Sequence, residues 1–292
     1  MKIPTELGLL TNLNVLTISQ VDFRGSIPTE MGHLTLLEEL ELSHGEPLAP
    51  DELGLSGILP TDIGSLTRLT SLTLSYSTVQ GRIPTEIGLL TNMQELVLLN
   101  NHLTGLIPTE IGFLTQLTLL DFDFNSLTGR LPTEIGYLTR LRRFDLDSNM
   151  FMVHIPTEIG LLTQLTFLDL NSNMLMGAIP TEVGLLTQLT ELGLFNNDLT
   201  GPVPSQIGHM KSLEFLLLQN NHLAGPIPIE LEKLSTLSLV NISSTCLKGS
   251  VEGTFCHTSS SSSSNRLLTL EANCDRVNCT CCTVCFNTTM FC

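Results

Sequence analysis

Acidic side chains recur at a regular spacing in the middle of the chain. The spacing is 24 residues in two series that run two residues apart: Asp121, Asp145 and Asp169, and then Asp123, Asp147 and Asn171. Residues two apart in an extended strand point to the same face, so these series predict a row of carboxylates on a sheet. Such a face can bind a basic protein or peptide, which is the partner that we expect. The alternatives are Ca²⁺, which prefers oxygen ligands, and a solvated acidic face partly neutralised by Arg143.

Aromatic side chains extend the predicted face, and little else in the sequence points to chemistry. Phe167, Phe195 and Phe215 take outward strand positions beyond the acidic residues, where exposed aromatic groups are typical of contact surfaces. The chain has no phosphate-binding glycine loop, no H-E-x-x-H, no G-x-S-x-G and no kinase motif, and its seven histidines are dispersed. We therefore predict that the protein is not an enzyme. We expect no catalytic residue, and neither a cofactor nor a metal ion is required.

The composition excludes several classes of partner. The 292 residues include 13 Lys+Arg and 29 Asp+Glu, a formal net charge of −16. Nucleic acids and anionic membranes are bound through Lys and Arg, so this balance argues against both. The apolar residues are scattered, without the uninterrupted run of about 18 that a membrane-spanning helix needs.

An internal repeat positions the acidic residues. An Ile/Leu/Val-Pro pair recurs with its proline at 4, 28, 60, 84, 108, 132, 156, 180, 204 and 228, every 24 residues apart from one interval of 32. Within the unit that starts at Met93, the L-x-L alternation predicts a short strand with Leu96 and Leu98 inward and Val97 and Leu99 outward. Stacked copies of this strand predict a parallel sheet.

One asparagine per repeat follows the predicted strand. Its side-chain amide can bond backbone groups that the turn leaves unpaired, which predicts a structural ladder. The ladder consists of Asn101, Asn125, Asn149, Asn173, Asn197 and Asn221.

The repeat L-x-x-L-x-L-x-x-N-x-L-x-G-x-I-P resembles the 24-residue, plant-type subclass of leucine-rich repeats over residues 3–251. The resemblance implies an α/β repeat solenoid, a horseshoe with a parallel β-sheet on its concave side and short 3-10 or helical turns on its convex side. We expect a solenoid over 1–251, with an insertion at 45–52, and a Cys-rich C-terminal cap over 252–292 with a Ser-rich loop at 258–264. Binding in this family is usually through the concave face.

All eight cysteines lie in the C-terminal part. They are Cys246, Cys256, Cys274, Cys279, Cys281, Cys282, Cys285 and Cys292. An even number in a short segment predicts four disulfides of undetermined pairing, with a zinc site as the alternative. This ending resembles the cap of leucine-rich-repeat proteins in diatoms and related algae.

Three glycosylation sequons, at Asn241, Asn278 and Asn287, accompany the cysteines and favour an extracellular or cell-surface protein. Because Met1 falls in the middle of a repeat, we also expect the sequence to be a fragment of a longer chain. Either a signal peptide or a membrane anchor could then precede it.

The sequence thus predicts an extracellular recognition module, receptor-like or adhesive, that binds a basic protein or peptide on its acidic concave face. A cell-wall or matrix scaffold is the first alternative. Ice binding is the second, because threonines form two columns: Thr5, Thr29, Thr61, Thr85, Thr109, Thr133, Thr157 and Thr181, and then Thr11, Thr35, Thr67, Thr91, Thr115, Thr139, Thr163 and Thr187. For the first column we also expect a structural role, capping a short helical turn.

Overall fold

The computed structural model describes residues 2–19, 24–44, 54–250, 269–273, 277–278 and 284–286. The chain divides into two compact units, Met1–Met150 and Phe151–Cys292, and each is described by itself. The predicted insertion at 45–52 and the Ser-rich loop at 258–264 lie outside the described residues, so both stay predictions, as does the boundary between solenoid and cap.

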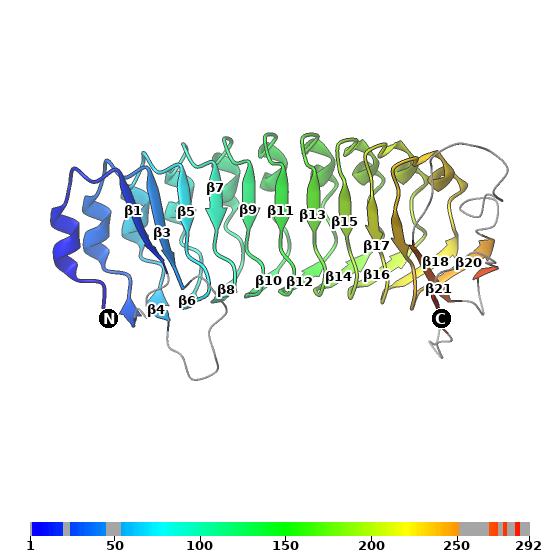
Figure 1. Cartoon of the computed structure of the whole chain (residues 1–292), viewed down its shortest axis with the longest axis horizontal. Coiled ribbons are helices and arrows are strands. Elements are labelled where there is room, and N and C mark those ends of the chain that lie inside the picture. Colours follow the sequence, from blue (N-terminus) through cyan, green and yellow to red (C-terminus); the bar gives the residue numbers. More distant parts are fainter. Residues whose placement is uncertain are drawn as a thin grey trace. The chain divides into compact units, whose positions relative to one another are not determined.

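In the first unit, the repeats build two parallel ladders of strands and a series of 3-10 helices (Figure 1). The main sheet contains, in order, β1 (Val15–Ser19), β3 (Glu39–Ser43), β5 (Ser71–Thr73), β7 (Glu95–Val97), β9 (Leu119–Asp121) and β11 (Arg143–Asp145). The second ladder contains β2 (Gly25–Ser26), β4 (Leu55–Ile58), β6 (Thr78–Gly81), β8 (His102–Gly105) and β10 (Ser126–Gly129). The helices are η1 (Thr5–Leu9), η2 (Thr29–His33), η3 (Thr61–Ser65), η4 (Thr85–Leu89), η5 (Thr109–Phe113) and η6 (Thr133–Tyr137).

The second unit repeats this plan. Its main sheet contains β13 (Phe167–Asp169), β15 (Glu191–Gly193), β17 (Phe215–Leu217), β19 (Leu239–Asn241), β21 (Thr269–Asn273) and β23 (Val284–Phe286). Its second ladder contains β12 (Met150–Val153), β14 (Met174–Gly177), β16 (Asp198–Gly201), β18 (His222–Pro226), β20 (Cys246–Ser250) and β22 (Val277–Asn278). Its helices are η7 (Thr157–Leu161), η8 (Thr181–Leu185), η9 (Ser205–His209) and η10 (Ile229–Lys233).

Inward-facing leucines stack from strand to strand and form the core. Leu96 pairs in register with Leu72 on one side and Leu120 on the other, and all three are fully buried. The residues between them alternate outward, as the predicted period of two requires. Each buried Leu contributes about 1.5–3 kcal/mol before the cost of ordering the chain.

The Pro-Thr-Glu-Ile-Gly segments form 3-10 helices because proline fixes an extended entry and glycine permits close stacking. In η4, Pro84 stands at the N-cap, and its carbonyl accepts a hydrogen bond from the Ile87 N–H at 3.1 Å. A Cβ at Gly88 would lie 2.7 Å from the Cβ of Glu110 in the next helix. Any side chain there would push adjacent repeats apart.

The ladder asparagines tie each turn to the preceding repeat. The Asn125 Nδ2 donates to the Leu98 carbonyl at 2.9 Å and to the Phe122 carbonyl at 3.1 Å, and its Oδ1 accepts from the Leu103 N–H at 3.0 Å. Asn101 and Asn149 bond at the same sequence offsets in the first unit, as do Asn197 and Asn221 in the second. In the second unit, Asn173 accepts from the Phe151 N–H at 2.9 Å.

The residue before each ladder asparagine takes a left-handed backbone conformation. Asn100, Asn196 and Asn220 tolerate it well, but Phe124 adopts it too, with φ of 48°, and its ring is 53% exposed. Asparagine is enriched at such angles, whereas a bulky side chain is strained there. The turn after each strand is therefore held in this conformation by the hydrogen bonds of the ladder asparagine that follows.

Within the described residues, no helix combines the length and the apolar character needed to cross a bilayer.

Candidate functional site

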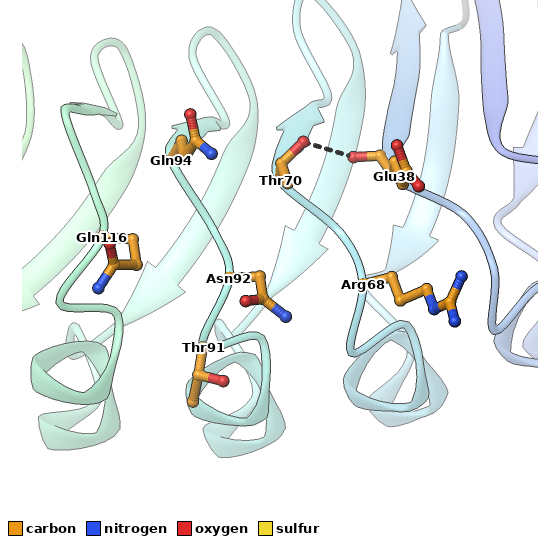
Figure 2. Close-up of a pocket in the computed structure, with 7 residues that line it drawn as sticks. All are labelled: Glu38, Arg68, Thr70, Thr91, Asn92, Gln94 and Gln116. Carbon is orange, nitrogen blue, oxygen red and sulfur yellow. Dashed lines mark hydrogen bonds between the residues drawn. The ribbon is translucent and has the colours of Figure 1, made fainter.

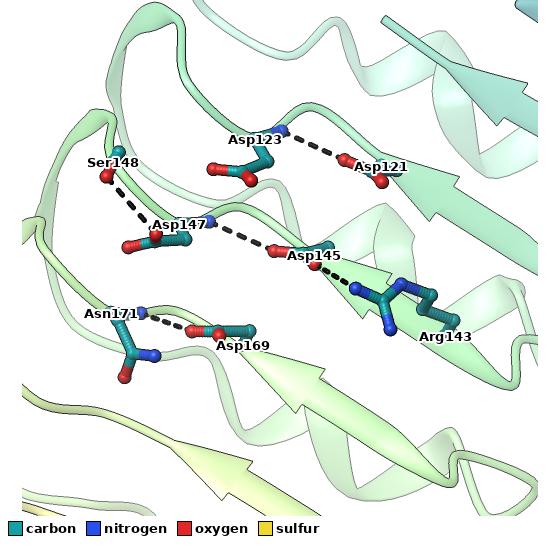
Figure 3. Close-up of polar contacts among 8 residues, drawn as sticks. All are labelled: Asp121, Asp123, Arg143, Asp145, Asp147, Ser148, Asp169 and Asn171. Carbon is teal, nitrogen blue, oxygen red and sulfur yellow. Dashed lines mark hydrogen bonds and ion pairs between the residues drawn. The ribbon is translucent and has the colours of Figure 1, made fainter. Parts of the chain in front are cut away.

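Four aspartates of the first unit lie together at the ends of two neighbouring strands; we call Asp121, Asp123, Asp145 and Asp147 the acidic cluster (Figure 3). Asp121 of β9 and Asp145 of β11 are register partners, so their side chains leave the same face of the sheet. The first carboxylate of each pair accepts a hydrogen bond from the backbone N–H two residues on, at 3.1 Å for Asp123 and 3.3 Å for Asp147. The two predicted series of acids are thus side by side.

Arg143 neutralises one member of the cluster. Its Nη2 lies 2.6 Å from Asp145 Oδ2, and the Asp145 side chain is only 6% exposed. Because this carboxylate is covered and already paired, it offers little to a binding partner. The carboxylates of Asp121, Asp123 and Asp147 remain as the accessible part of the cluster.

Two carboxylate oxygens in the cluster lack a hydrogen-bond donor. The Oδ1 atoms of Asp123 and Asp147 are covered and have no partner among the described residues. Ser148 donates to the other oxygen of Asp147, at 3.2 Å. A covered acceptor without a donor costs about 1–3 kcal/mol, more when it is charged. The cluster therefore holds more negative charge than its own donors compensate.

The pKa values express this excess. Burial, followed by the charge of Asp145, raises the pKa of Asp121 to about 6. Burial and then the charges of Asp145, Asp147 and Asp121 raise the pKa of Asp123 to about 8. Burial also raises the pKa of Asp145, although Arg143 opposes the effect. The cluster therefore retains protons near neutral pH, and a nearby cation would displace them.

The predicted contact residues of the second unit make a different surface. Asn171 is 2% exposed, and its Oδ1 accepts from the Phe195 N–H at 2.9 Å, while its own N–H donates to Asp169 Oδ1 at 2.9 Å. Asp169 and Asn171 fill the space over Gly193, where a Cβ would lie 2.7–2.8 Å from them. This polar pair supports the strand ends, and Asn171 is too covered to contact a partner, whereas Asp169 is half-buried.

The three phenylalanines lie on this face but are only partly exposed. Phe167 and Phe215 are both register partners of Glu191, so one carboxylate stands between two rings. Phe215 is 36% exposed, and Phe167 and Phe195 are half-buried.

Of the predicted metal, disulfide and glycosylation sites, the structure describes only a part. Among the described residues, no group of three or more His, Cys, Asp or Glu side chains is arranged to hold a metal ion. Cys246 is buried and disulfide-bonded. The side chains of the other seven cysteines and of the sequon residues Asn278 and Asn287 lie outside the described residues. Asn241 is on strand β19, and its Nδ2, which would carry a glycan, donates to Glu271 at 2.6 Å.

A shallow polar hollow lies beside the sheet of the first unit, and the sequence did not predict it. Its lining comprises Glu38, Arg68, Thr70, Thr91, Asn92, Gln94 and Gln116 (Figure 2). Thr70 Oγ1 donates to the Glu38 carbonyl at 3.0 Å, and Asn92 Nδ2 donates to the Thr67 carbonyl at 2.8 Å. These side chains bond the loops between repeats, and no nucleophile stands beside a base in the hollow.

The threonine columns are exposed, but the predicted capping role is wrong. Proline, not threonine, occupies the N-cap, and in η4 no side chain caps the helix. Thr85 is the first helical residue, and its hydroxyl donates to Glu86 at 3.3 Å; six further threonines of the first column bond the next glutamate in the same way. Since the proline before them already fixes the extended entry, the threonines begin the helix instead of capping it.

An exposed apolar row lies between the threonine columns. In the first unit it comprises Leu89, Phe113 and Tyr137, which are 57%, 62% and 62% exposed. The rings of Phe113 and Tyr137 cover Gly88 and Gly112 of the preceding helices. Sequence reasoning overlooked this row, although its signal is present: the residue after Thr-Glu-Ile-Gly varies and is often apolar.

Two compact units of parallel strands and 3-10 turns, locked by buried asparagines, define the class of solenoid repeat proteins. Sequence comparison identifies the repeat. A model described as a leucine-rich repeat region matches residues 132–280, and a second leucine-rich repeat model matches 92–114 and 116–138. The chain belongs to the leucine-rich repeat family, which confirms the predicted fold class. No curated protein sequence is detectably similar to it.

Solved structures of plant proteins resemble the chain. One is the ectodomain of the Arabidopsis thaliana membrane receptor kinase GASSHO1/SCHENGEN3 in complex with CASPARIAN STRIP INTEGRITY FACTOR 2, with 32% identity, a TM-score of 0.83, and coverage of 95% of this chain and 32% of that one. A second is the Arabidopsis receptor kinase HAESA with the peptide hormone IDA and the co-receptor SERK1, with 29% identity, a TM-score of 0.69, and coverage of 88% and 50%. The chain thus spans a third to a half of these receptor structures.

A plant ice-binding protein is also similar in structure. The identity is 28%, the TM-score is 0.67, and the match covers 80% of this chain and 73% of that protein.

Proposed function

We propose that the protein is a recognition module that binds a basic peptide segment on the sheet face of its first unit. The observation that carries the proposal is the surplus of carboxylates over donors in the acidic cluster. Within the part of the chain that the structure describes, one guanidinium is paired with a carboxylate of the four aspartates, and two covered oxygens have no donor. An Arg or Lys side chain from a partner would supply the missing positive charge and form charge-assisted hydrogen bonds.

The structural neighbours support a peptide as the partner. Two of the receptor ectodomains are named as complexes with CASPARIAN STRIP INTEGRITY FACTOR 2 and with the peptide hormone IDA. A sheet face several strands wide suits an extended peptide, because each strand presents one set of outward side chains to it. We accordingly assign the chain to the interaction scaffolds and not to the enzymes.

The proposal extends to an extracellular or cell-surface location. The neighbours are ectodomains of membrane receptors, and the disulfide at Cys246 is typical of an oxidising compartment. Non-reducing peptide mapping of protein secreted from eukaryotic cells tests this part. We expect four disulfides and glycan on at least one sequon; free thiols throughout would contradict it.

Binding can be tested with a fluorescein-labelled peptide of alternating Arg and Gly, followed by fluorescence anisotropy at low salt. We expect the double variant Asp123→Asn/Asp147→Asn to weaken binding at least tenfold, since each lost charge-assisted hydrogen bond is worth about 1.5 kcal/mol. The matched control is Asp62→Asn/Glu86→Gln, which removes two charges from the 3-10 side of the same unit. Equal weakening by both variants would show attraction by net charge alone and would refute the site.

Ice binding is the second candidate, and the exposed side of the 3-10 helices favours it. There, threonine columns flank the apolar row formed by Leu89, Phe113 and Tyr137, and a plant ice-binding protein shares the fold. The glutamate beside each threonine of the first column opposes it, because a charged side chain stays strongly hydrated. Thermal hysteresis distinguishes the two functions: activity lost in Thr91→Lys/Thr115→Lys but kept in Asp123→Asn would favour ice binding.

A further inference from the structure

The outward face of the second ladder in the second unit carries a group of sulfur atoms. Strand β12 reads Met-Phe-Met-Val and strand β14 reads Met-Leu-Met-Gly. Met152 is the register partner of Met174, while Phe151 and Leu175 are buried in the core. Met152, Met174 and Met176 are therefore on one outward face, 38%, 40% and 45% exposed.

An imidazole joins these thioethers. A Cβ at Gly177, the residue after Met176, would overlap His154 Cδ2 and would lie 2.7 Å from its Nε2. The histidine ring thus lies over Gly177 of β14, the residue that follows Met176. On the other side of Met176, its register partner Asp198 contributes a negative charge from β16. Three thioethers and an imidazole thus lie on neighbouring strands of one ladder, next to the strand that carries Asp198, whose Oδ1 is 3.6 Å from His222 Nε2.

The backbone at this patch departs from the rest of the solenoid. Val153 has φ of 78°, whereas the corresponding residues of the adjacent repeats, Gly129 and Gly177, are glycines with φ of 82° and 77°. A β-branched residue in this region is strained. The strain is stored in the residue that separates Met152 from His154.

We propose that Met152, His154, Met174 and Met176 bind a soft monovalent metal ion, Cu(I) or its redox-inert analogue Ag(I). Thioethers are soft, neutral ligands that select Cu(I) over the hard divalent ions, and imidazole also suits copper. Parallel strands are about 4.8 Å apart, and methionine has three rotatable bonds, so the sulfurs of paired strands can turn towards one ion. The carboxylate of Asp198 favours a cation over a neutral ligand.

This site is independent of the proposed peptide binding. It uses the second ladder and the second unit, and none of the acidic cluster. Sequence reasoning considered carboxylates as ligands for Ca²⁺ and cysteines as ligands for zinc, and overlooked the methionines. The signal is the M-F-M-V-H string followed by M-L-M at the repeat spacing, with valine in place of the repeat glycine.

The experiment uses the full chain with ¹³C-labelled methionine methyl groups, titrated with Ag(I) and followed by NMR. We expect the methyl signals of Met152, Met174 and Met176 to shift and to saturate at one equivalent. Met93 and Met210 are fully buried in the core and serve as internal controls that should not shift.

Methionine-to-leucine variants separate coordination from apolar contact, since leucine keeps the volume and the exposed apolar surface but removes the sulfur. Met152→Leu/Met174→Leu/Met176→Leu should raise the Kd for Ag(I) at least tenfold, and His154→Ala severalfold. A shift confined to other methyl groups, or an unchanged Kd in the triple variant, would overturn the site and assign the metal to cysteine sulfur elsewhere. If the triple variant unfolds, Met174→Leu alone should still weaken binding measurably.

Discussion

Replacing Asp123 with Asn should stabilise the protein at high pH and leave its stability nearly unchanged at low pH. The substitution keeps the shape of the side chain and removes one charge from the acidic cluster. Two repeats further along the chain, the corresponding residue is already an asparagine, Asn171, so the backbone accepts an amide at this position.

The magnitude follows from the neighbours of Asp123. Burial, followed by the charges of Asp145, Asp147 and Asp121, raises its pKa from the ordinary value of 3.8 to about 8. Each such neighbour repels by about 1 kcal/mol at 4 Å in water, and Arg143 offsets part of this. We expect a gain of about 1–3 kcal/mol at pH 9.5 in low salt, and less in 1 M salt, where the Debye length falls to about 3 Å.

The sign of the pH dependence is fixed by linkage. Between the unfolded pKa and the folded pKa, the folded state holds a proton that the unfolded chain has released. Stability from this group is therefore complete below about pH 4 and is lost as the pH rises through about 8. Asn and neutral Asp should differ little only below about pH 4; at pH 5 the unfolded Asp is already ionised, so part of the gain is present there and the rest develops as the pH rises to 9.5.

Urea unfolding of both proteins at pH 5 and pH 9.5 measures the effect, with Asp62→Asn as a control on an exposed residue away from the cluster. The double difference should exceed 1 kcal/mol for Asp123→Asn and stay near zero for the control. The same change at both pH values, or a loss of stability at pH 9.5, would refute the argument that the cluster is overcharged.

Three other predictions concern the turn and the cluster. Asn125→Ala should lower the free energy of unfolding in urea by about 1–3 kcal/mol, because the Leu103 N–H loses its acceptor. The exposed Asn92→Ala is the control and should change it by less than about 0.5 kcal/mol. Equal losses in the two variants would contradict the structural role of the ladder. Phe124→Asn should raise the free energy of unfolding by about 1 kcal/mol, because asparagine adopts the left-handed backbone conformation with less strain than phenylalanine. A lower urea midpoint in this variant would show that Phe124 is not strained. Binding of the Arg-Gly peptide at pH 7 should release protons from Asp123, detected by calorimetry as a heat that depends on the ionisation enthalpy of the buffer; a heat independent of the buffer would contradict this.

Much of the fold was predictable because its period is written directly in the sequence. The spacing of prolines and leucines gave the strand positions, so Leu96 and Leu98 were correctly expected in the core. In a solenoid each contact lies about one repeat away, so a local pattern determines most of the tertiary structure.

The candidate site was predictable only in outline. The period placed the aspartates in one row. It could not show that Asp145 would be covered and paired with Arg143, or that the Asn171 side chain would accept a hydrogen bond from the Phe195 N–H. Those outcomes depend on which neighbours cover each group and on which oxygen finds a donor. The capping role of threonine failed for a similar reason, because proline had already taken the N-cap.

The constant offsets of the asparagine bonds have a consequence for how such a protein changes over generations. Asn125 reaches backbone groups 22 and 27 residues back, and Asn149 repeats the same two offsets. Unequal recombination that adds or removes 24 codons leaves every one of these bonds with an equivalent partner. Gain or loss of a single residue inside a repeat would instead misalign the bonds at that turn. The lineage can therefore lengthen or shorten its sheet in whole repeats, while the number of residues between each ladder asparagine and its backbone partners stays fixed.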